Sequence, residues 1–238
     1  MKGILLAGGR GTRLQGITQG QNKHLLPIQG EAMFLHGLRL LRRAGVSKLV
    51  VVVNPNEEPL FQRELENCGF GDQEIRLIPQ NRPSGIPDGL LLALGEEAPE
   101  PCALLLGDNF FEEDLAPFIR AWNPESHPAQ VFLKRVEDCS PFGTATLDRG
   151  QITSLIEKPP KEAPGFAVTG CYLLDSTAHD KAAILMPSKR GETEILELLS
   201  QYQAQEGLSH QTLRGWWADA GTPIGLNFVQ KHFRSTLG

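Results

Sequence analysis

Glycines and cations gather near the start of the chain. Residues 8–13 read GGRGTR, and a lone lysine, Lys23, follows ten residues later. Three glycines in four residues let a backbone turn sharply and approach a ligand closely, and backbone N–H groups in such a loop suit an anion. Arg13 and Lys23 add fixed positive charge. The segment therefore predicts a cradle for a triphosphate, although a plain glycine turn between a strand and a helix would also explain it.

Two common nucleotide-binding patterns do not match this loop. The Walker A pattern requires Gly-Lys followed by Ser or Thr, whereas Gly11 is followed by Thr12 and Arg13. The dinucleotide fingerprint requires a third glycine where Leu14 stands. The missing glycine argues against a nicotinamide-binding Rossmann protein.

Two aspartates follow predicted strands far apart in the chain. Asp108 comes just after the apolar run at 102–106, and Asp219 follows the segment that begins at Trp216. Ligands of open α/β sheets bind at the carboxyl ends of the strands. Two carboxylates there could hold Mg²⁺ against phosphate oxygens, or each could simply cap a helix or form a turn.

Other polar residues give weaker signals. Lys158 stands between Glu157 and a proline that ends a predicted strand, and it could bind a second phosphate or be a solvated loop lysine. The charge run 189–192 predicts an exposed turn before a helix. Trp216 and Trp217 could stack on a sugar or base, or only pack.

Strands and helices alternate over residues 1–128, which predicts a doubly wound sheet of mostly parallel strands. The expected strands are 4–7, 49–53, 75–78 and 102–106, and the expected helices are 33–44, 57–67 and 90–97.

Residues 129–238 are richer in predicted antiparallel strands. The expected strands are 131–136, 143–147, 151–157, 166–174, 209–213 and 216–218, and the expected helices are 176–186, 192–205 and 223–233. Because no linker separates the halves, we expect one domain over 1–238. Its fold class is α/β, a Rossmann-like mixed sheet with an inserted antiparallel lobe.

Composition limits the partners. With 238 residues and a net charge of −5, the chain is unlike a nucleic-acid binder that works through a basic face. The four cysteines are scattered without a CxxC pair, which favours a reducing cytoplasm over a disulfide framework or zinc site. No apolar stretch approaches the roughly 20 residues that span a bilayer, and no signal peptide is visible. We therefore expect a cytoplasmic protein without nucleic-acid or membrane partners.

The joint order of these motifs resembles the sugar-1-phosphate nucleotidyltransferases, most closely the short bacterial glucose-1-phosphate thymidylyltransferases. The resemblance runs from Met1 to about Val229. Its motifs are Gly8-Gly9-Arg10-Gly11-Thr12-Arg13-Leu14, Asn22-Lys23-His24-Leu25-Leu26-Pro27, Leu106-Gly107-Asp108-Asn109, Glu157-Lys158-Pro159, Val168-Thr169-Gly170-Cys171-Tyr172, Arg190-Gly191-Glu192-Thr193-Glu194 and Trp217-Ala218-Asp219-Ala220-Gly221-Thr222.

The resemblance implies a reaction in which a sugar 1-phosphate oxygen attacks the α-phosphorus of a nucleoside triphosphate and pyrophosphate leaves. The expected substrates are dTTP and glucose 1-phosphate, with UTP, CTP or another hexose 1-phosphate left open. Arg13 and Lys23 would hold the triphosphate, Lys158 the sugar phosphate, and Asp108 and Asp219 the Mg²⁺. A rival of another class is a non-catalytic nucleotide-sugar binding subunit. The presence of all five of these residues argues against it.

The resemblance also implies two groups of binding residues. The nucleotide would contact Leu6, Gly8, Gly9, Gly11, Thr12, Gln80, Gly85 and Asp108, with Gln80 and Gly85 reading the base edge. The sugar would contact Asn109, Gly143, Glu157, Val168, Tyr172 and Trp217.

Some features depart from the family pattern. Leu14 is followed by Gln15-Gly16 without the usual proline, and Pro87-Asp88 replaces an alanine-rich helix start. Asp88, expected near the base or ribose, weakens the prediction of thymine. Because the chain ends soon after the expected helix 223–233, we expect a monomer or a dimer rather than a tetramer.

Overall fold

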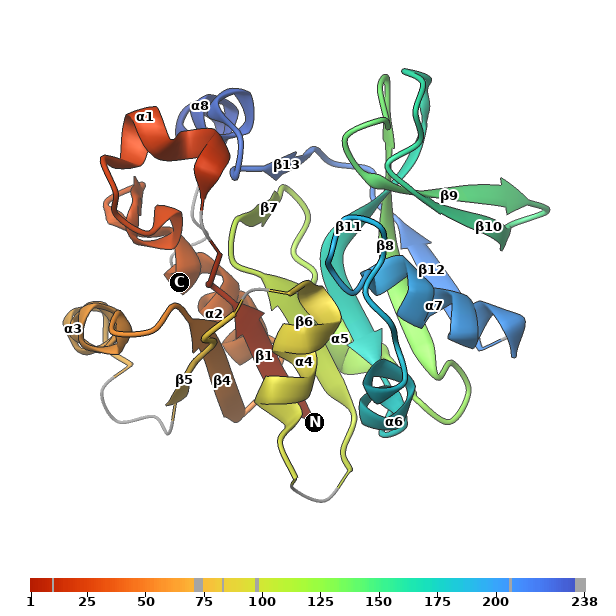
Figure 1. The fold of residues 1–238 in the computed structure, drawn as a ribbon, viewed down its shortest axis with the longest axis horizontal. Coiled ribbons are helices and arrows are strands. Elements are labelled where there is room, and N and C mark those ends of the chain that lie inside the picture. The colour runs from red at the N-terminus through yellow and green to blue at the C-terminus, as the bar shows by residue number, and fades with distance from the viewer. Residues whose placement is uncertain (10, 71–74, 83, 97–98, 206, 234–238) are drawn as a thin grey trace.

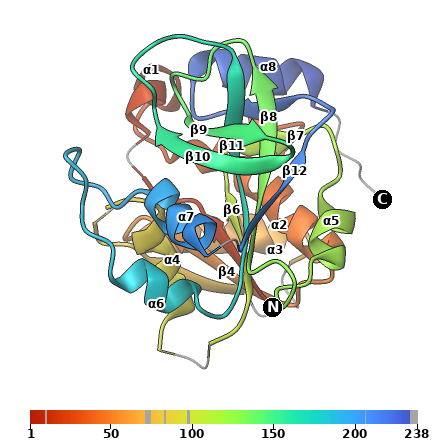
Figure 2. The same ribbon diagram turned by 90° about the vertical axis from the view of Figure 1, so that its right-hand side faces the viewer.

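The computed structural model describes residues 1–9, 11–70, 75–82, 84–96, 99–205 and 207–233. Its main feature is a nine-stranded sheet with helices on both faces (Figures 1 and 2). Four neighbouring parallel strands form one half of the sheet, in the order Ile75–Pro79 (β5), Lys48–Val53 (β4), Lys2–Leu6 (β1) and Cys102–Leu106 (β6).

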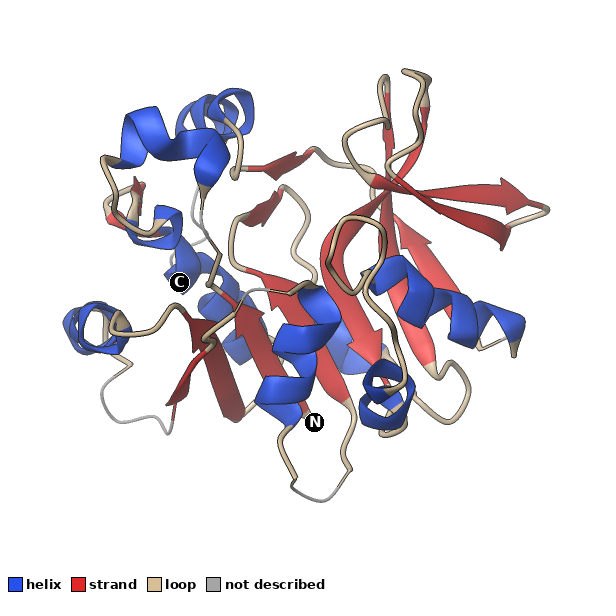
Figure 3. Ribbon diagram, in the orientation of Figure 1, coloured by secondary structure: helices blue, strands red, loops and turns tan. Residues whose placement is uncertain are grey.

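The other half is mostly antiparallel and comes from later residues. It consists of Ala129–Val136 (β8), Gly143–Asp148 (β9), Gln151–Glu157 (β10), Gly165–Leu174 (β11) and Leu208–Thr212 (β12). β11 continues the sheet antiparallel to β6, and β8 and β12 follow it. Phe166 and Ala167 of β11 also pair with β9, so the β9–β10 hairpin branches away from the sheet (Figure 3). The predicted mixed sheet with an antiparallel lobe is confirmed.

Two helical layers cover this sheet. One face carries Met33–Arg43 (α2), Glu58–Asn67 (α3) and Ala116–Ala121 (α5), and the other carries Ile86–Leu94 (α4), Ala178–Ala183 (α6) and Ile195–Ala204 (α7) (Figure 2). Successive strand side chains point to opposite faces. Leu5 and Val51 therefore pack with α2, whereas Ile4 and Val50 pack with α4. Because both faces are covered, these strands are apolar without alternation.

A small third cluster lies beyond the carboxyl end of β6. Asn109–Phe111 (β7) pairs antiparallel with Trp217–Asp219 (β13), and Pro223–His232 (α8) packs behind them. The register of this ribbon places Asp219 opposite Asn109. It thereby brings Asp219 beside Asp108. Two further pieces near this end are Gln15–Thr18 (α1) and the hairpin of Pro27–Ile28 (β2) with Glu31–Ala32 (β3).

Several predicted boundaries differ from the structure. The helix expected at 90–97 begins at Ile86, because Pro87 occupies its first turn, where a missing N–H costs nothing. It ends at Leu94, and residue 97 lies outside the described residues. The helices expected at 176–186 and 192–205 are shorter, and α5 and β7 were not predicted. No helix among the described residues could cross a membrane.

Candidate active site

A cavity of about 390 Å³ opens at the carboxyl ends of β1 and β6. Its volume falls within the range of sites for small organic ligands. The predicted residues that line it are Leu6, Gly8, Gly9, Arg13, Lys23, Gln80, Gly85, Asp108, Asn109, Gly143, Glu157, Lys158, Val168, Tyr172, Trp217 and Asp219. Gly11 and Thr12 are not among the lining residues, and their role stays a prediction.

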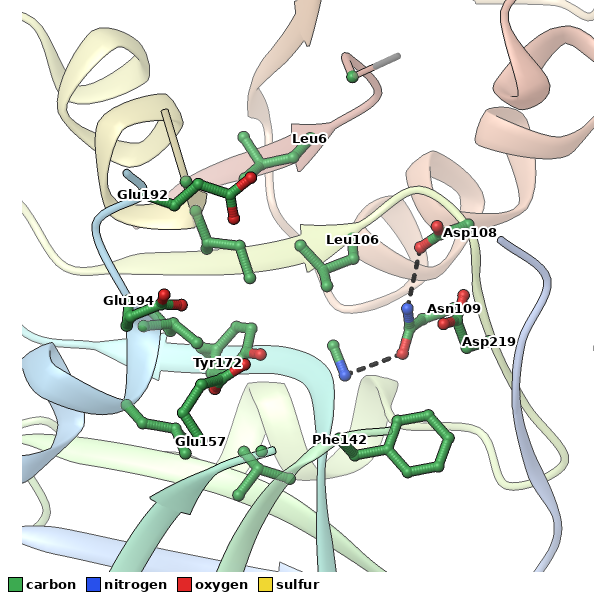
Figure 4. Close-up of a pocket in the computed structure, with 18 of the residues that line it drawn as sticks. Leu6, Leu106, Asp108, Asn109, Phe142, Glu157, Tyr172, Glu192, Glu194 and Asp219 are labelled. Atoms are coloured by element: carbon green, nitrogen blue, oxygen red, sulfur yellow. Dashed lines mark hydrogen bonds between the residues drawn. The ribbon is translucent and has the colours of Figure 1, made fainter. Parts of the chain in front are cut away.

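Asp108 and Asp219, the carboxylate pair, face one small space at one end of the cavity (Figure 4). The Ala220 N–H donates to the Asp108 backbone carbonyl over 2.8 Å, which ties the two segments together. A Cβ placed on Gly221 would lie 2.7 Å from Asp108 Oδ2 and 2.8 Å from Asp219 Oδ1. The absence of a side chain at this glycine therefore keeps the space between the two carboxylates open.

Each carboxylate is paired with a cation from the N-terminal segment. Lys23 Nζ donates to Asp108 Oδ2, and Arg13 Nη1 lies 3.6 Å from Asp219 Oδ2. Lys23 is largely buried, whereas more than half of the Arg13 side chain is exposed. The structure thus brings together the four charged residues predicted to hold a triphosphate and a metal.

Burial and mutual repulsion govern the charge of the pair. Burial opposes ionisation of Asp108, but the charge of Lys23 and its hydrogen bond outweigh this effect and hold the pKa of Asp108 below its usual range. Burial and the Asp108 charge raise the pKa of Asp219. A divalent cation between the two would relieve this repulsion.

The donor set suits Mg²⁺, which is commonly bound by one or two carboxylates with water and phosphate oxygens completing the shell. The described residues contain no cluster of three or more His, Cys, Asp or Glu side chains able to hold a metal. Two carboxylates alone leave most coordination positions to a phosphate-bearing substrate and water.

Asn109 joins the carboxylate pair to the wall of the cavity. Its Nδ2 donates to Asp108 Oδ1 over 3.0 Å (Figure 4). Its Oδ1 accepts from the Gly170 N–H at 2.9 Å and from Trp217 Nε1 at 2.7 Å. The hydrogen bonds of the Asn109 amide therefore orient Asp108 and the Trp217 ring. The contact of Asn109 with a sugar stays a prediction.

The opposite end of the cavity is also charged. Arg190 Nη2 donates to Glu157 Oε1 at 3.0 Å and to Glu194 Oε2 at 2.7 Å. Lys158 Nζ lies 3.7 Å from Glu157 Oε1, and its backbone is left-handed, with φ of 46°. Such a conformation is unfavourable for lysine, and residues held this way cluster at functional sites. The charge pattern at 189–192 predicted only an exposed turn, so the place of Arg190 in the cavity wall was missed.

Asn54 holds the glycine loop in place and was also missed by sequence reasoning. Its Oδ1 accepts from the Gly9 N–H at 2.8 Å, and its Nδ2 donates to the Gly9 carbonyl at 3.3 Å. It follows β4 directly, at the same sheet edge as Asp108, so the strand-end rule that singled out Asp108 could have found it. The Gly9 N–H already donates to Asn54. An anion at the loop would therefore be bound by other loop amides and by the nearby cations.

We expect Asn54→Ala to raise the KM for the triphosphate about 30-fold, with a smaller change in kcat. The reason is that an unclamped loop must be ordered when the anion binds, at a cost of about 1 kcal/mol per hydrogen bond lost. Steady-state kinetics measure both constants. Asn67→Ala, an exposed position at the end of α3, is the matched control. An unchanged KM in the Asn54 variant would contradict the clamp.

His24 is a buried histidine beneath the carboxylate pair. Burial, with the neighbouring Lys23 charge, lowers its pKa to about 3. Its Nδ1 lies 2.9 Å from Asn22 Oδ1, and Asn22 Nδ2 donates to the Ala7 carbonyl at 2.9 Å. The neutral imidazole therefore packs between the end of β1 and the Lys23 turn.

This shift predicts acid sensitivity. Below pH 6.5 the unfolded chain takes up a proton at His24 while the folded protein does not until about pH 3. Stability is therefore lost as pH falls through this window, by up to about 1.4 kcal/mol per pH unit. Urea unfolding at pH 5.0–7.0 should show stability falling with pH, and His24→Gln should reduce this slope. His127→Gln, at an exposed position, should leave it unchanged. An identical slope in His24→Gln would overturn the assignment.

Comparison with known proteins agrees with this geometry. The model of the family described as nucleotidyl transferase matches residues 2–235. The chain belongs to this family. The glucose-1-phosphate thymidylyltransferase of Neisseria gonorrhoeae is 40% identical over 243 residues, covering 97% of this chain and 83% of that protein. That of Xanthomonas campestris pv. campestris (strain B100) is 37% identical over 237 residues, covering 96% and 80%.

Solved nucleotidyltransferase structures share the fold. A Bacillus anthracis protein described as a glucose-1-phosphate thymidylyltransferase, in complex with a sucrose, superposes with a TM-score of 0.88. It is 32% identical, and the match covers 97% of this chain and 94% of that one. A UDP-glucose pyrophosphorylase complexed with UDP-glucose has a TM-score of 0.83 at 20% identity, which shows the fold alone. The predicted family and enzyme class are confirmed, and the protein is a nucleotidyltransferase.

Proposed function

We propose that this nucleotidyltransferase transfers a thymidylyl group from dTTP to glucose 1-phosphate in the presence of Mg²⁺. The names of the relatives support both substrates. The observation that carries the proposal is the carboxylate pair, in which each aspartate faces the same space and each is paired with a cation from the N-terminal segment.

The reaction joins two anions. An oxygen of the sugar 1-phosphate forms a bond to the α-phosphorus of the triphosphate, and the bond from that phosphorus to the bridging oxygen breaks. Pyrophosphate leaves with the bonding electrons. No general base is needed, because a phosphate monoester is already largely ionised near pH 7. Catalysis therefore depends on positioning and on charge stabilisation.

The residues of the cavity have distinct tasks in this scheme. Arg13 binds the β- and γ-phosphates and stabilises the charge of the departing pyrophosphate, while Lys23 bridges the triphosphate. Lys158, at the other end of the cavity, orients the incoming sugar phosphate. Asp108 and Asp219 would hold the Mg²⁺, which supplies positive charge at the α-phosphate when bound.

The nucleotide and the sugar would bind in two different regions of the cavity. The nucleotide lies over Leu6, Gly8 and Gly9, with its base at Gln80 and Gly85. The sugar lies among residues from the second half of the chain, of which Gly143, Glu157, Val168, Tyr172 and Trp217 line the cavity. Residues 1–128 are thus the nucleotide-binding half and 129–238 the sugar-binding half of one domain. We further propose a cytoplasmic enzyme that is a monomer or a dimer.

A substrate panel tests the proposal. The protein is incubated with Mg²⁺, each of dTTP, UTP, CTP, GTP and ATP, and several sugar 1-phosphates, and pyrophosphate is measured. We expect the fastest release with dTTP and glucose 1-phosphate. Preference for UTP with every sugar would contradict the thymidylyl assignment, and no release from any pair would contradict the catalytic assignment.

A further inference from the structure

Asp88, the acidic residue that departs from the family pattern, contacts the side chain expected to read the base. Gln80 Nε2 donates to Asp88 Oδ2 over 3.1 Å. The backbone holds both residues, because the Gln80 N–H donates to the Val53 carbonyl at 2.9 Å and Asp88 lies in the first turn of α4. Both side chains are half-buried.

This contact determines which end of the Gln80 amide faces the cavity. An amide side chain has one donor end and one acceptor end, and its two orientations occupy nearly the same space. An ionised carboxylate only accepts hydrogen bonds. Asp88 therefore selects the orientation in which the NH₂ group of Gln80 turns toward the Asp88 carboxylate and Oε1 turns away from that carboxylate.

Two glycines lie beside this oxygen. A Cβ on Gly8 would lie 3.7 Å from Gln80 Oε1, and a Cβ on Gly89 would lie 3.8 Å from it. Gly8 and Gln80 both line the cavity. Gln80 Oε1 receives no hydrogen bond from any described residue, so this acceptor is available to a ligand at the nucleotide end.

We propose that Asp88 is a positioning residue that presents Gln80 to the nucleobase as a hydrogen-bond acceptor and thereby selects bases with a ring N–H. The inference rests on the proposed function, because it assumes that the nucleotide binds at this end of the cavity. Thymine and uracil carry N3–H, and guanine carries N1–H. Cytosine N3 and adenine N1 are acceptors, whose lone pairs would face that of Gln80 Oε1.

This role reverses the expectation drawn from the sequence. In the sequence analysis, an acidic residue near the base or ribose weakened the prediction of thymine. In the structure the Asp88 carboxylate accepts a hydrogen bond from Gln80 Nε2. Acting through Gln80, Asp88 favours thymine and uracil over cytosine.

The experiment measures binding, so that it does not depend on turnover. Calorimetric titration with dTTP and with dCTP, in Mg²⁺ and without sugar phosphate, gives the ratio of their Kd values. Four proteins are compared: wild type, Asp88→Asn, Gln80→Ala and the double variant. Asp180→Asn, a change at an exposed position of α6, is the matched control.

We expect the wild type and the control to bind dTTP about 100-fold more tightly than dCTP, since a site built around a hydrogen bond rejects an analogue that lacks it. Asp88→Asn should reduce this ratio about tenfold, because asparagine can donate or accept and lets the Gln80 amide turn. The double variant should match Gln80→Ala, since Asp88 acts only through Gln80.

Three results would overturn the inference: a wild type that binds dCTP as tightly as dTTP, an Asp88→Asn variant with an unchanged ratio, or a further loss when Asp88→Asn is added to Gln80→Ala. Transfer to glucose 1-phosphate is assayed separately with the same proteins. Absence of transfer with every triphosphate, alongside the expected binding ratios, would overturn the proposed function and leave the base-selection role supported.

Discussion

Replacing Asp108 with asparagine should lower kcat by about three orders of magnitude, equivalent to about 4 kcal/mol of transition-state stabilisation. The substitution removes one of the two carboxylates that would hold Mg²⁺. It also leaves the Lys23 ammonium beside a neutral amide, where that charge has lost its partner. Asparagine keeps the shape of the side chain, so a large loss of activity reflects charge and metal binding more than packing.

The measurement combines activity with metal affinity. Titration with Mn²⁺, followed by paramagnetic resonance in the presence of dTTP, should show that Asp108→Asn weakens the metal site. Asp148→Asn, an exposed carboxylate at the end of β9, should change neither activity nor metal affinity. If Asp108→Asn retains near-normal turnover and metal binding, Asp108 only supports the turn after β6.

The strand framework was predictable because its signals are local. Cys102–Leu106 and Gln151–Glu157 were predicted with the boundaries that the structure shows, since each is an apolar or alternating run bounded by turn residues. β7 was missed because its partner β13 lies about a hundred residues further along the chain. Only that distant pairing, and not the composition of Asn109–Phe111, makes the segment a strand.

Four charged residues of the cavity were predictable from motif order, whereas Arg190 and the supporting contacts were missed. Arg13, Lys23, Asp108 and Asp219 each occur in a recognisable motif, and the structure brings them together. The position of Asn54 directly after β4 could have marked it as a strand-end residue, but its role as a clamp depends on where the glycine loop lies in space. A hydrogen bond between residues 45 positions apart leaves no trace in local composition.

Gly221→Ala should lower kcat/KM at least about 100-fold, because the added methyl would enter the space between the two carboxylates. The new methyl would lie 2.7 Å from Asp108 Oδ2, 2.8 Å from Asp219 Oδ1 and 3.0 Å from Lys23 Nζ. Real Cβ atoms essentially never lie closer than 3.0 Å to another atom, so the two carboxylate contacts cannot persist. The Lys23 side chain can retreat, but the carboxylates are held by hydrogen bonds and must turn.

Hydrogen bonds hold both carboxylates in place, so the added methyl would disturb the metal site. Asp219 Oδ1 accepts from the Gly221 N–H at 2.7 Å, and Asp108 Oδ1 accepts from Asn109 Nδ2 at 3.0 Å. A methyl between the two carboxylates breaks or bends one of these bonds and occupies the space that Mg²⁺ would need. The Mg²⁺ concentration required for half-maximal activity should therefore rise together with the loss of kcat/KM.

Gly16→Ala is the matched control, because a Cβ at that position in α1 meets nothing within 4 Å. Alanine in a helix is favoured over glycine by up to about 1 kcal/mol, so this variant should be active and no less stable than the wild type. Kinetics across a Mg²⁺ series, with thermal unfolding of both variants, separate a local block from misfolding. If Gly221→Ala folds normally and keeps activity within threefold of Gly16→Ala, the metal cannot lie between Asp108 and Asp219, because the methyl would occupy that space.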